Sequence, residues 1–437
     1  MVATGGSSDG LAARAVALKL VQGVLDGGLS LDQQMEEDRA FAALPPRDRA
    51  FAHALAATTL RRHGDLAAAV KTLVTRPLPK SAGPAFVILL LGAAQLLLMA
   101  TPAHAAISAS VDLAKHDVKA RHFAGLVNAV LRKVAALDPA TLAADPTRNL
   151  PDWLKTRLVA AHGADATAAM ARAHAAVAAI DLTVKADAAL WAERLGATLL
   201  PTGSLRLPEG HAPIPELPGF AEGHWWVQDA AAALPARLAG DVAGHTVLDL
   251  CAAPGGKTAQ LAAAGAMVTA VDDAPARMAR LQDNLNRLRL SATCLTADVM
   301  TLPEDQQYDL VLLDAPCSAT GTIRRHPDLP HLKSARQLDS LVKLQARMLD
   351  KAARLVRPGG RLLYCTCSLL PEEGEGQTDA FLARHADFAR AGMTAAELGG
   401  EAQLLTPRGD FRSHPGMAFG AGTLDGFYAA RLIRSAC

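Results

Sequence analysis

Aromatic side chains are scarce in this sequence of 437 residues, since Phe, Trp and Tyr together make up only 4% of it. Hydrophobic residues nevertheless reach 50%, so the cores must be built mainly from Ala, Leu and Val. This apolar content, with 20% charged residues, excludes a disordered or fibrous chain. The length predicts two or three domains, because a domain holds about 150 residues.

Cysteine is also rare. Six cysteines are too few for a disulfide scaffold of this length. Two of them form the segment Cys365-Thr366-Cys367, whose spacing is unlike that of a zinc knuckle, and no other Cys or His pair has the spacing of a metal site. The N-terminus lacks a basic segment followed by an apolar run and a cleavage site, which argues against secretion. We therefore expect a reducing, cytoplasmic location and no bound metal.

A membrane span is not expected either. The apolar stretch Phe86–Met99 has about fourteen residues, whereas a span needs about twenty, and Gln95 interrupts it. Pro84 and Pro102 flank the stretch as a helix start and a helix stop. The pattern predicts the central buried helix of an α-helical domain.

Residues 1–138 are predicted to form this all-α domain. Apolar residues recur at helical spacing from Leu11 to about Leu137, and glycine and proline turns separate the segments. The first 140 residues hold 15 Lys and Arg against 11 Asp and Glu, a net charge of +4. From charge alone, a solvated surface explains this bias better than a nucleic-acid interface does.

The pattern changes twice further along the chain. Residues 139–235 combine helical stretches, an extended segment at Asp181–Lys185 and a loop rich in Pro and Gly from Pro201 to Gly223, which predicts a small α+β connector. From residue 236 to residue 437, short apolar runs alternate with helices, as in a doubly wound parallel sheet. The predicted strands are Thr246–Leu250, Met267–Val271, Leu310–Asp314 and Arg361–Thr366, and the predicted helices include 276–288 and 337–355.

A glycine-rich turn follows the first of these strands, in Asp249-Leu-Cys-Ala-Ala-Pro-Gly-Gly-Lys-Thr258. Such a turn lets a cofactor approach the backbone closely. A phosphate loop would need glycine where Cys251 stands, and Gly255-Gly256-Lys257 lacks the Gly-x-Gly of the dinucleotide fingerprint. Both nucleotide classes are therefore disfavoured.

Two acidic residues point to an adenosyl group instead. Asp272 ends the second strand, 17 residues after Gly255, where a carboxylate can accept the two hydroxyls of a ribose. An ordinary surface aspartate is the alternative, and the neighbouring Asp273 is the less favoured candidate. Asp298 follows a short third strand and can bond the adenine amino group. A cofactor with adenosine and no phosphates is S-adenosylmethionine.

Two cysteines follow the next two strands of this sheet. Cys317 lies in Asp314-Ala-Pro-Cys-Ser-Ala-Thr-Gly321, and Cys367 lies in Thr366-Cys-Ser-Leu-Leu-Pro-Glu-Glu373. Ligands of such sheets bind at the carboxyl ends of the strands, and structural cysteines are usually buried within an element. The placement therefore favours reactive thiols over structural ones. A disulfide between the two thiols is the alternative, but it would have no role in a reducing compartment.

These blocks resemble the Nol/Nop/Sun family of RNA cytosine-5 methyltransferases over residues 228–433. The stretch Asp425–Ile433 is similar to the family's last strand. The helical N-terminal region resembles the NusB-like domain of the bacterial member that methylates 16S ribosomal RNA. Cys365 departs from the family pattern, which has a small residue without sulfur there, although Cys367 holds the motif position.

The resemblance implies a Rossmann-like methyltransferase domain that uses S-adenosylmethionine, with Cys367 as the nucleophile, Cys317 assisting product release and Asp314 contacting cofactor and base. It implies cofactor contacts from Cys251, Ala252, Ala253, Pro254, Gly255, Gly256, Lys257, Asp272, Asp298 and Asp314. The expected partner is RNA, namely 16S ribosomal RNA in single-stranded or loop form, bound by a monomer. The base must leave its stack to reach a thiol at a strand end.

Alternatives remain open. A methyltransferase acting on transfer RNA or DNA would use related chemistry, although a DNA enzyme attacks with the Pro-Cys thiol and would leave Cys367 without a role. An RNA-binding antitermination module would explain the helical domain alone. A nicotinamide dehydrogenase is the most distant alternative. Arg324, Arg325 and His326 either hold RNA phosphates or form a solvated loop.

Overall fold

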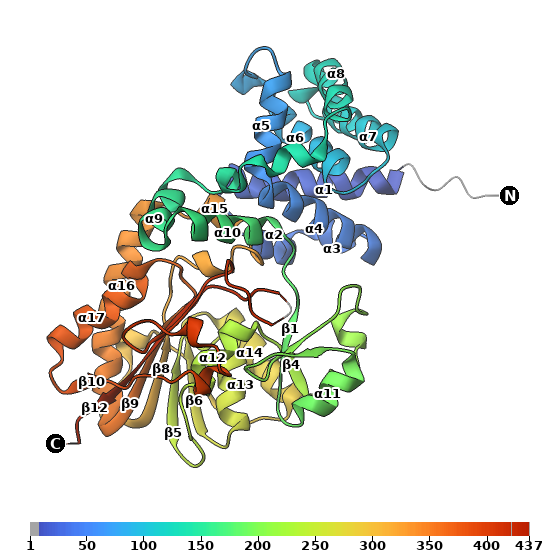
Figure 1. Cartoon of the computed structure of the whole chain (residues 1–437). Coiled ribbons are helices and arrows are strands. Elements are labelled where there is room, and N and C mark those ends of the chain that lie inside the picture. Colours follow the sequence, from blue (N-terminus) through green and yellow to red (C-terminus); the bar gives the residue numbers. More distant parts are fainter. Residues whose placement is uncertain (1–7, 421, 437) are drawn as a thin grey trace. The chain divides into compact units, whose positions relative to one another are not determined.

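Helices joined by loops make up residues 8–175 in the computed structural model, which describes residues 8–420 and 422–436 (Figure 1). The α-helices are α1 (Ser8–Leu25), α2 (Leu31–Glu37), α3 (Arg39–Ala43), α4 (Pro46–Arg61), α5 (His63–Leu73), α6 (Ala85–Leu97), α7 (Ala103–His116), α8 (Ala124–Val134), α9 (Asp152–His162) and α10 (Ala164–Ala175). The prediction of an all-α region without strands is confirmed for this part of the chain.

Helix α6 forms the centre of this unit. Eleven of its residues are buried, because neighbouring helices cover it on every side. Its one polar side chain is satisfied: Gln95 Nε2 donates to the Leu91 carbonyl at 3.1 Å, and Arg14 Nε donates to Gln95 Oε1 at 2.7 Å. The prediction of a buried helix is confirmed. No helix among the described residues is both long and apolar enough to cross a membrane.

A short segment from later in the chain belongs to the same unit. Contacts divide the chain into one unit of residues 1–159, 163–176 and 323–333 and a second unit of residues 160–162, 177–322 and 334–437. Within residues 323–333, which include α15 (Leu329–Leu332), Asp328 accepts the Leu31 N–H at 2.9 Å and His331 bonds the Leu60 carbonyl at 3.1 Å. These two units are defined by contacts alone. The division into functional segments 1–138, 139–235 and 236–437 therefore remains a prediction.

The second unit is built on a large twisted sheet with strand order β10-β12-β9-β8-β5-β6-β7 (Figure 1). Its parallel strands are β5 (Thr246–Leu250), β6 (Met267–Asp272), β7 (Thr293–Thr296), β8 (Tyr308–Asp314) and β9 (Val356–Thr366). The order reverses at β5, between β6 and β8, which confirms the doubly wound prediction. Three antiparallel strands extend the sheet beyond β9: β10 (Phe388–Arg390), β11 (Phe411–Ser413) and β12 (Phe427–Arg434).

Alternating residues of each strand pack on opposite faces of the sheet. Val247, Leu310 and Leu363 pack with α12 (Ala230–Arg237) and α13 (Gly256–Ala263). Leu248, Val311 and Leu362 pack on the other face with α16 (Ala335–Leu355) and α17 (Glu375–Arg384). Helix α14 (Pro275–Leu288) packs against α13 and β6. The strands are therefore apolar on both faces, as the continuous apolar runs predict.

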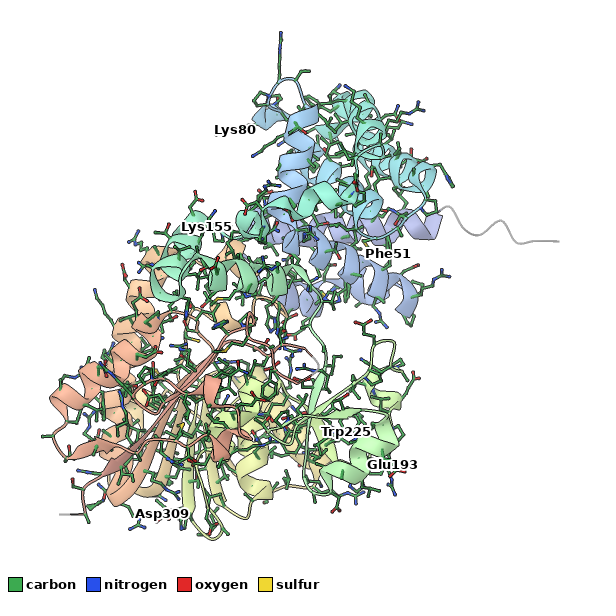
Figure 2. All side chains as sticks on the ribbon, viewed as in Figure 1. Phe51, Lys80, Lys155, Glu193, Trp225 and Asp309 are labelled. Atoms are coloured by element: carbon green, nitrogen blue, oxygen red, sulfur yellow. The ribbon has the colours of Figure 1, made fainter. Side chains whose placement is uncertain are left out.

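A small antiparallel sheet precedes the large one. It has the order β2-β3-β1-β4, from β1 (Asp181–Val184), β2 (Thr198–Leu199), β3 (Leu205–Arg206) and β4 (Trp225–Val227), with α11 (Ala188–Leu195) beside it. Trp225 is fully buried in its core (Figure 2). The buried carboxylate of Asp181 accepts two bonds from the guanidinium of Arg206, at 2.7 and 2.9 Å, and one from the N–H of Ala230 at 3.2 Å.

We expect this buried ion pair to control the stability of the small sheet. The variant Arg206→Leu leaves the Asp181 charge buried without its partner, which should lower the free energy of unfolding by about 3–5 kcal/mol. Chemical denaturation followed by tryptophan fluorescence measures this, because Trp191, Trp225 and Trp226 lie in this region. The exposed Lys343→Ala is the control and should leave the transition in place. An unchanged transition in Arg206→Leu would contradict the expectation.

Candidate active site

The two predicted thiols meet at one edge of the large sheet. Strands β8 and β9 pair in parallel, with Asp314 opposite Cys365, so both chains leave the sheet at the same edge. Cys317 lies three residues beyond β8 and Cys367 directly beyond β9. Their Sγ atoms are 3.4 Å apart, and both side chains are partly exposed. The structure therefore brings together two residues that are 50 positions apart in sequence, and both are free thiols.

A cavity of about 580 Å³ opens beside these thiols. This volume lies within the range of small-molecule sites, about 300–1,000 Å³. Seven predicted site residues line it: Cys251, Ala253, Asp272, Asp298, Asp314, Cys317 and Cys367. The other predicted residues, Ala252, Pro254, Gly255, Gly256 and Lys257, form the turn and the first residues of α13 behind it. Apolar walls come from Val299, Met300, Ala315, Pro316, Leu344 and Met348.

The turn between β5 and α13 requires glycine. Gly255 has φ +99°, a left-handed conformation that side chains rarely adopt, and a Cβ there would lie 2.8 Å from Leu281. The turn brings Cys251 and Ala253 to the cavity. Below it, the hydroxyl of Thr258 donates to the buried carboxylate of Asp249 at 2.6 Å, and burial raises the pKa of Asp249 to about 7.

Asp272 lies at the end of β6 with a buried carboxylate aimed at this turn. It accepts the N–H groups of Ala253 at 3.2 Å and Ala274 at 3.1 Å, and the exposed Arg277 at 2.9 Å. A carboxylate has about four lone-pair sites, so this pattern leaves acceptor capacity for a hydroxyl. Arg277 also bonds Asp273 at 3.0 Å, which gives its guanidinium a second partner when a ligand occupies Asp272.

Lys257 and Asp314 form an ion pair at the back of the cavity. The ammonium lies 2.6 Å from Asp314 Oδ2. Burial is the largest single effect on Lys257 and acts to lower its pKa, but the charge of Asp314, its hydrogen bond to the ammonium and the nearby Cys365 and Asp249 together hold the pKa above its usual value. The thiol of Cys365 lies 3.5 Å from the other oxygen, Oδ1. The sequence reasoning treated Lys257 as a cofactor contact and did not foresee this pair.

The surroundings raise the pKa of three thiols at this edge. Burial and the Asp314 charge raise the pKa of Cys251 and Cys365 well above the usual value. The hydrogen bond with Cys367, together with burial, raises the pKa of Cys317. These three groups therefore keep their protons at neutral pH, which matters because the thiolate is the reactive form of cysteine.

Sequence reasoning missed some residues of this site. Leu344, Arg347 and Met348 of α16 line the cavity, and only the structure shows which turn of this amphipathic helix reaches it. Of the basic trio Arg324, Arg325 and His326, Arg324 is buried in the helical unit, so it does not belong to a solvated loop. Within residues 8–420 and 422–436, no cluster of three or more His, Cys, Asp or Glu side chains is placed to hold a metal ion.

The site fits an adenosyl cofactor better than a phosphate-bearing one. Asp272 and Asp314 end two of the strands, Asp298 lies two residues beyond a third, and their carboxylates line a pocket with apolar walls. Carboxylates accept hydrogen bonds from hydroxyl, amino and ammonium groups, whereas they repel phosphates. This set of acceptors therefore suits a cofactor with ribose hydroxyls and a positive charge.

Comparison with known proteins identifies both regions. Residues 238–433 match the family model of the 16S rRNA methyltransferase RsmB/F, and residues 11–136 match that of the NusB family. The chain is 36% identical to ribosomal RNA small subunit methyltransferase B of Xanthomonas campestris, with 100% of both chains covered. It is 34% identical to the protein of that name from Vibrio cholerae, covering 96% of this chain and 97% of that one.

Solved structures show the same fold. A methyltransferase homolog protein from Pyrococcus horikoshii has a TM-score of 0.56 and 24% identity, covering 68% of this chain and 100% of that one. NSun6 from the same organism, crystallised with SFG, has a TM-score of 0.56 and 18% identity over 66% of this chain and 98% of that one. With sequence relatives matched over their full length, the chain belongs to the RsmB/F family of 16S rRNA methyltransferases and is an RNA methyltransferase that depends on S-adenosylmethionine.

Proposed function

We propose that this enzyme methylates carbon 5 of a cytosine in 16S ribosomal RNA through a covalent bond between Cys367 and the base. The observation that carries the proposal is the pair of thiols, whose Sγ atoms lie 3.4 Å apart just beyond the ends of two neighbouring strands. Both thiols line the cavity that Asp272, Asp298 and Asp314 also line. Methylation of a nitrogen or a ribose hydroxyl needs no thiol, so two thiols at this point favour attack on a carbon.

Carbon 5 of cytosine is a poor nucleophile, which explains the need for a thiol. The Cys367 thiolate adds to carbon 6, and the electron pair of the double bond becomes available at carbon 5. S-adenosylmethionine, when bound, supplies an electrophilic methyl group on a sulfonium. After the methyl group is attached, water takes the proton from carbon 5, and the electron pair of that bond forms the double bond to carbon 6. The sulfur of Cys367 leaves carbon 6 as a thiolate with the electron pair of the carbon–sulfur bond, which restores the aromatic ring.

Cys367 is the best nucleophile of the thiols at this edge. It lies beyond the end of β9 and is partly exposed to the cavity. Cys251, Cys317 and Cys365 have raised pKa values and remain thiols at neutral pH. Cys317 lies within hydrogen-bond distance of the Cys367 sulfur, so we assign it to assist release of the methylated product.

We assign Asp314 to hydrogen-bond the ring at N3 while Cys367 adds. Negative charge builds up on the ring in this step, and a donor at N3 stabilises it. To donate at N3, Asp314 must carry a proton taken up from solvent; the Lys257 ammonium, 2.6 Å away, keeps its own proton because its pKa is raised, and holds the Asp314 side chain in place. For the cofactor, we assign Asp272 to the ribose hydroxyls, Asp298 to the adenine edge, and the turn from Cys251 to Lys257 to close backbone contact.

The RNA is expected to present the target cytosine in a single-stranded or looped segment, because the base must leave its stack to reach Cys367. The helical segment 1–138 and the connector 139–235 are proposed to hold the RNA backbone around it. Binding should then weaken as salt is added. The relatives' names give ribosomal RNA as their substrate. We expect this enzyme to act on it in the cytoplasm and as a monomer.

Bisulfite sequencing tests the modified base directly. Total RNA from cells that lack the gene should lose one protected cytosine in 16S rRNA. Wild-type protein should restore that cytosine, and Cys367→Ala should not, because no thiolate is left to activate carbon 5. Cys367→Ala should still bind S-adenosylmethionine in calorimetry, which shows that the fold is intact. Protection lost from a transfer RNA instead would establish the alternative substrate, and turnover by Cys367→Ala would refute the nucleophile.

A second prediction concerns product release. If Cys317 assists the release step, Cys317→Ala should form the bond between Cys367 and the base but break it slowly. A protein–RNA adduct should then accumulate and appear as a shifted band on a denaturing gel. The double variant with Cys367→Ala is the control and should show no such band. Absence of the band in Cys317→Ala would count against the role of Cys317.

The proton on Cys317 can be measured without RNA. The rate of its alkylation by iodoacetamide, followed by peptide mass spectrometry, should reach its half-maximum only above pH 9, since the pKa of Cys317 lies above the usual value of a thiol. In Cys367→Ala the sulfur that contributes most to this shift is gone, so the midpoint should move to lower pH. An identical midpoint in both proteins would show that the two thiols do not interact.

A further inference from the structure

Glu373 is a fully buried carboxylate that the mechanism above does not use. It ends the 3₁₀ turn Pro371–Glu373 and has no measurable exposure. Oε1 accepts the N–H of Ser318 and the amide of Gln345, each at 2.9 Å. Oε2 accepts the hydroxyl of Ser368 at 2.6 Å and that of Ser318. A buried charge is costly unless hydrogen bonds satisfy it, and these four donors do so.

The donors to Glu373 come from the two loops that carry the site thiols. Ser318 follows Cys317, and Ser368 follows Cys367. One carboxylate therefore holds both loops, each by the residue next to its cysteine. Further contacts join the same loops: the hydroxyls of Ser318 and Ser368 lie 3.3 Å apart, and Gly321 donates its N–H to the Cys367 carbonyl at 2.9 Å.

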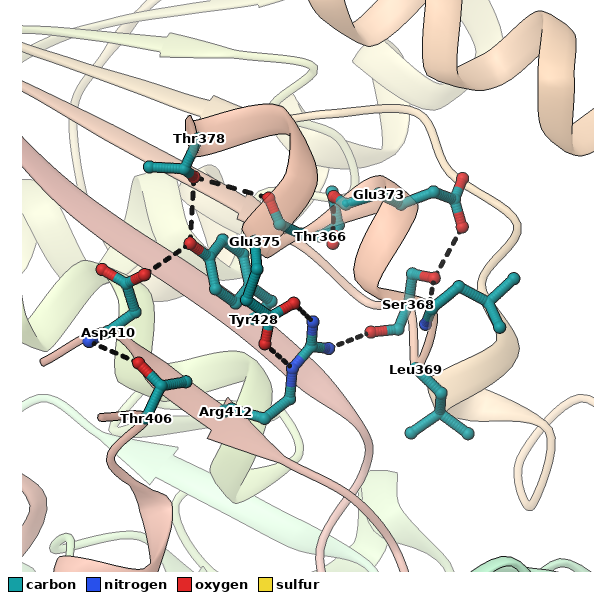
Figure 3. Close-up of polar contacts among 12 residues, drawn as sticks. Thr366, Ser368, Leu369, Glu373, Glu375, Thr378, Thr406, Asp410, Arg412 and Tyr428 are labelled. Carbon is teal, nitrogen blue, oxygen red and sulfur yellow. Dashed lines mark hydrogen bonds and ion pairs between the residues drawn. The ribbon is translucent and has the colours of Figure 1, made fainter. Parts of the chain in front are cut away.

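Glu373 itself is held in place by β9. Its backbone carbonyl accepts the hydroxyl of Tyr364 at 2.7 Å. The same carbonyl accepts the hydroxyl of Thr366 at 3.2 Å (Figure 3). These two bonds fix the backbone of Glu373 to β9, the strand that Cys367 directly follows. Arg412 holds one of the two loops: it donates to the Ser368 carbonyl at 2.6 Å, and its guanidinium pairs with Glu375 (Figure 3).

We propose that Glu373 is a positioning residue, which fixes the distance between the sulfurs of Cys317 and Cys367 by bonding both loops with one carboxylate. The consequence for catalysis rests on the proposed function: Cys317 can assist release only if its sulfur stays beside the carbon–sulfur bond that Cys367 forms. Errors of about 1 Å in such an arrangement can slow a step about 100-fold.

Two variants separate the reach of Glu373 from its charge. Glu373→Gln loses the charge but keeps the length: its carbonyl can accept from Ser318 N and Gln345, and its amide can donate to the two serine hydroxyls, which also accept. Glu373→Asp keeps the charge but is one methylene shorter, so it cannot reach both loops. If spacing is what matters, the glutamine variant behaves like wild type and the aspartate variant does not.

The first measurement needs neither RNA nor cofactor. Phenylarsine oxide bridges two thiols with loss of water, and it binds tightly only where the sulfurs are held close together. Wild type and Glu373→Gln should bind it with similar affinity, and Glu373→Asp about tenfold or more weaker. Cys317→Ala should lose bridging altogether. Tyr428→Phe is the matched control, because it removes buried hydrogen bonds to Thr378 and Asp410 without touching either cysteine loop (Figure 3).

The second measurement is the release of methylated RNA in a single turnover. Release should be about tenfold or more slower in Glu373→Asp, with accumulation of adduct, and close to wild type in Glu373→Gln. The proposal is overturned if the glutamine variant is as impaired as the aspartate variant, or if the aspartate variant binds the arsenical as wild type does. If the aspartate variant does not fold, the glutamine variant alone tests the proposal: wild-type arsenical affinity and release support it, and impaired values overturn it. If wild type formed no adduct while the arsenical affinities kept their order, the spacing role would stand and the proposed chemistry would be wrong.

Discussion

The parallel pairing of β8 with β9 is the interaction on which the site depends. The ladder places Asp314 opposite Cys365, and the pairing continues beyond the strands, where Ala315 donates to the Cys365 carbonyl at 2.9 Å. Parallel strands leave a sheet at the same edge, so two loops from distant parts of the sequence begin side by side. A shift of one residue in this register would turn Cys367 to the other face and separate it from Cys317.

The site holds several charges in a poorly hydrated place, and each is stabilised in a different way. Asp272 accepts two backbone N–H groups, Lys257 and Asp314 neutralise each other, and Glu373 is satisfied by uncharged donors. Asp249 has one hydroxyl partner, and burial raises its pKa to about 7. Opposite charges meet at two places beside the cavity: Lys257 pairs with Asp314, and Arg277 pairs with Asp272 and Asp273.

Much of the fold could be predicted from the sequence, because its signals are local. Continuous apolar runs predict β5, β6, β8 and β9, and the stretch Phe86–Met99 predicts the buried helix α6. The edge of the sheet where Cys317 and Cys367 emerge follows from the same pattern. The glycine turn, Asp272 and Asp298 pointed to the cofactor, and the resemblance to a methyltransferase family, now confirmed by relatives matched over their full length, added ribosomal RNA as the substrate.

The rest required three-dimensional contacts. Nothing in the order of residues says that residues 323–333 pack with the helical unit, since the strand before them and the helix after them belong to the other unit. The block that ends in Glu372-Glu373 is visible in the sequence, but only the structure shows that Glu373 is the buried one and that its partners lie on both cysteine loops. Likewise, helical periodicity predicts the apolar face of α16 without showing that Met348 reaches the cavity and Lys351 does not.

The contrast between Cys365 and Cys367 shows how two neighbouring thiols can differ. Cys365 is still paired in β9, its side chain packs in the core of the sheet, and Asp314 Oδ1 accepts its S–H at 3.5 Å. Burial and this carboxylate raise its pKa well above the usual value, so it stays protonated and acts as a weak donor. Cys367 lies one residue beyond the strand and is partly exposed at the cavity. A sulfur at position 365 is unusual for this family. It adds a hydrogen bond to Asp314 and does not compete with Cys367 as a nucleophile.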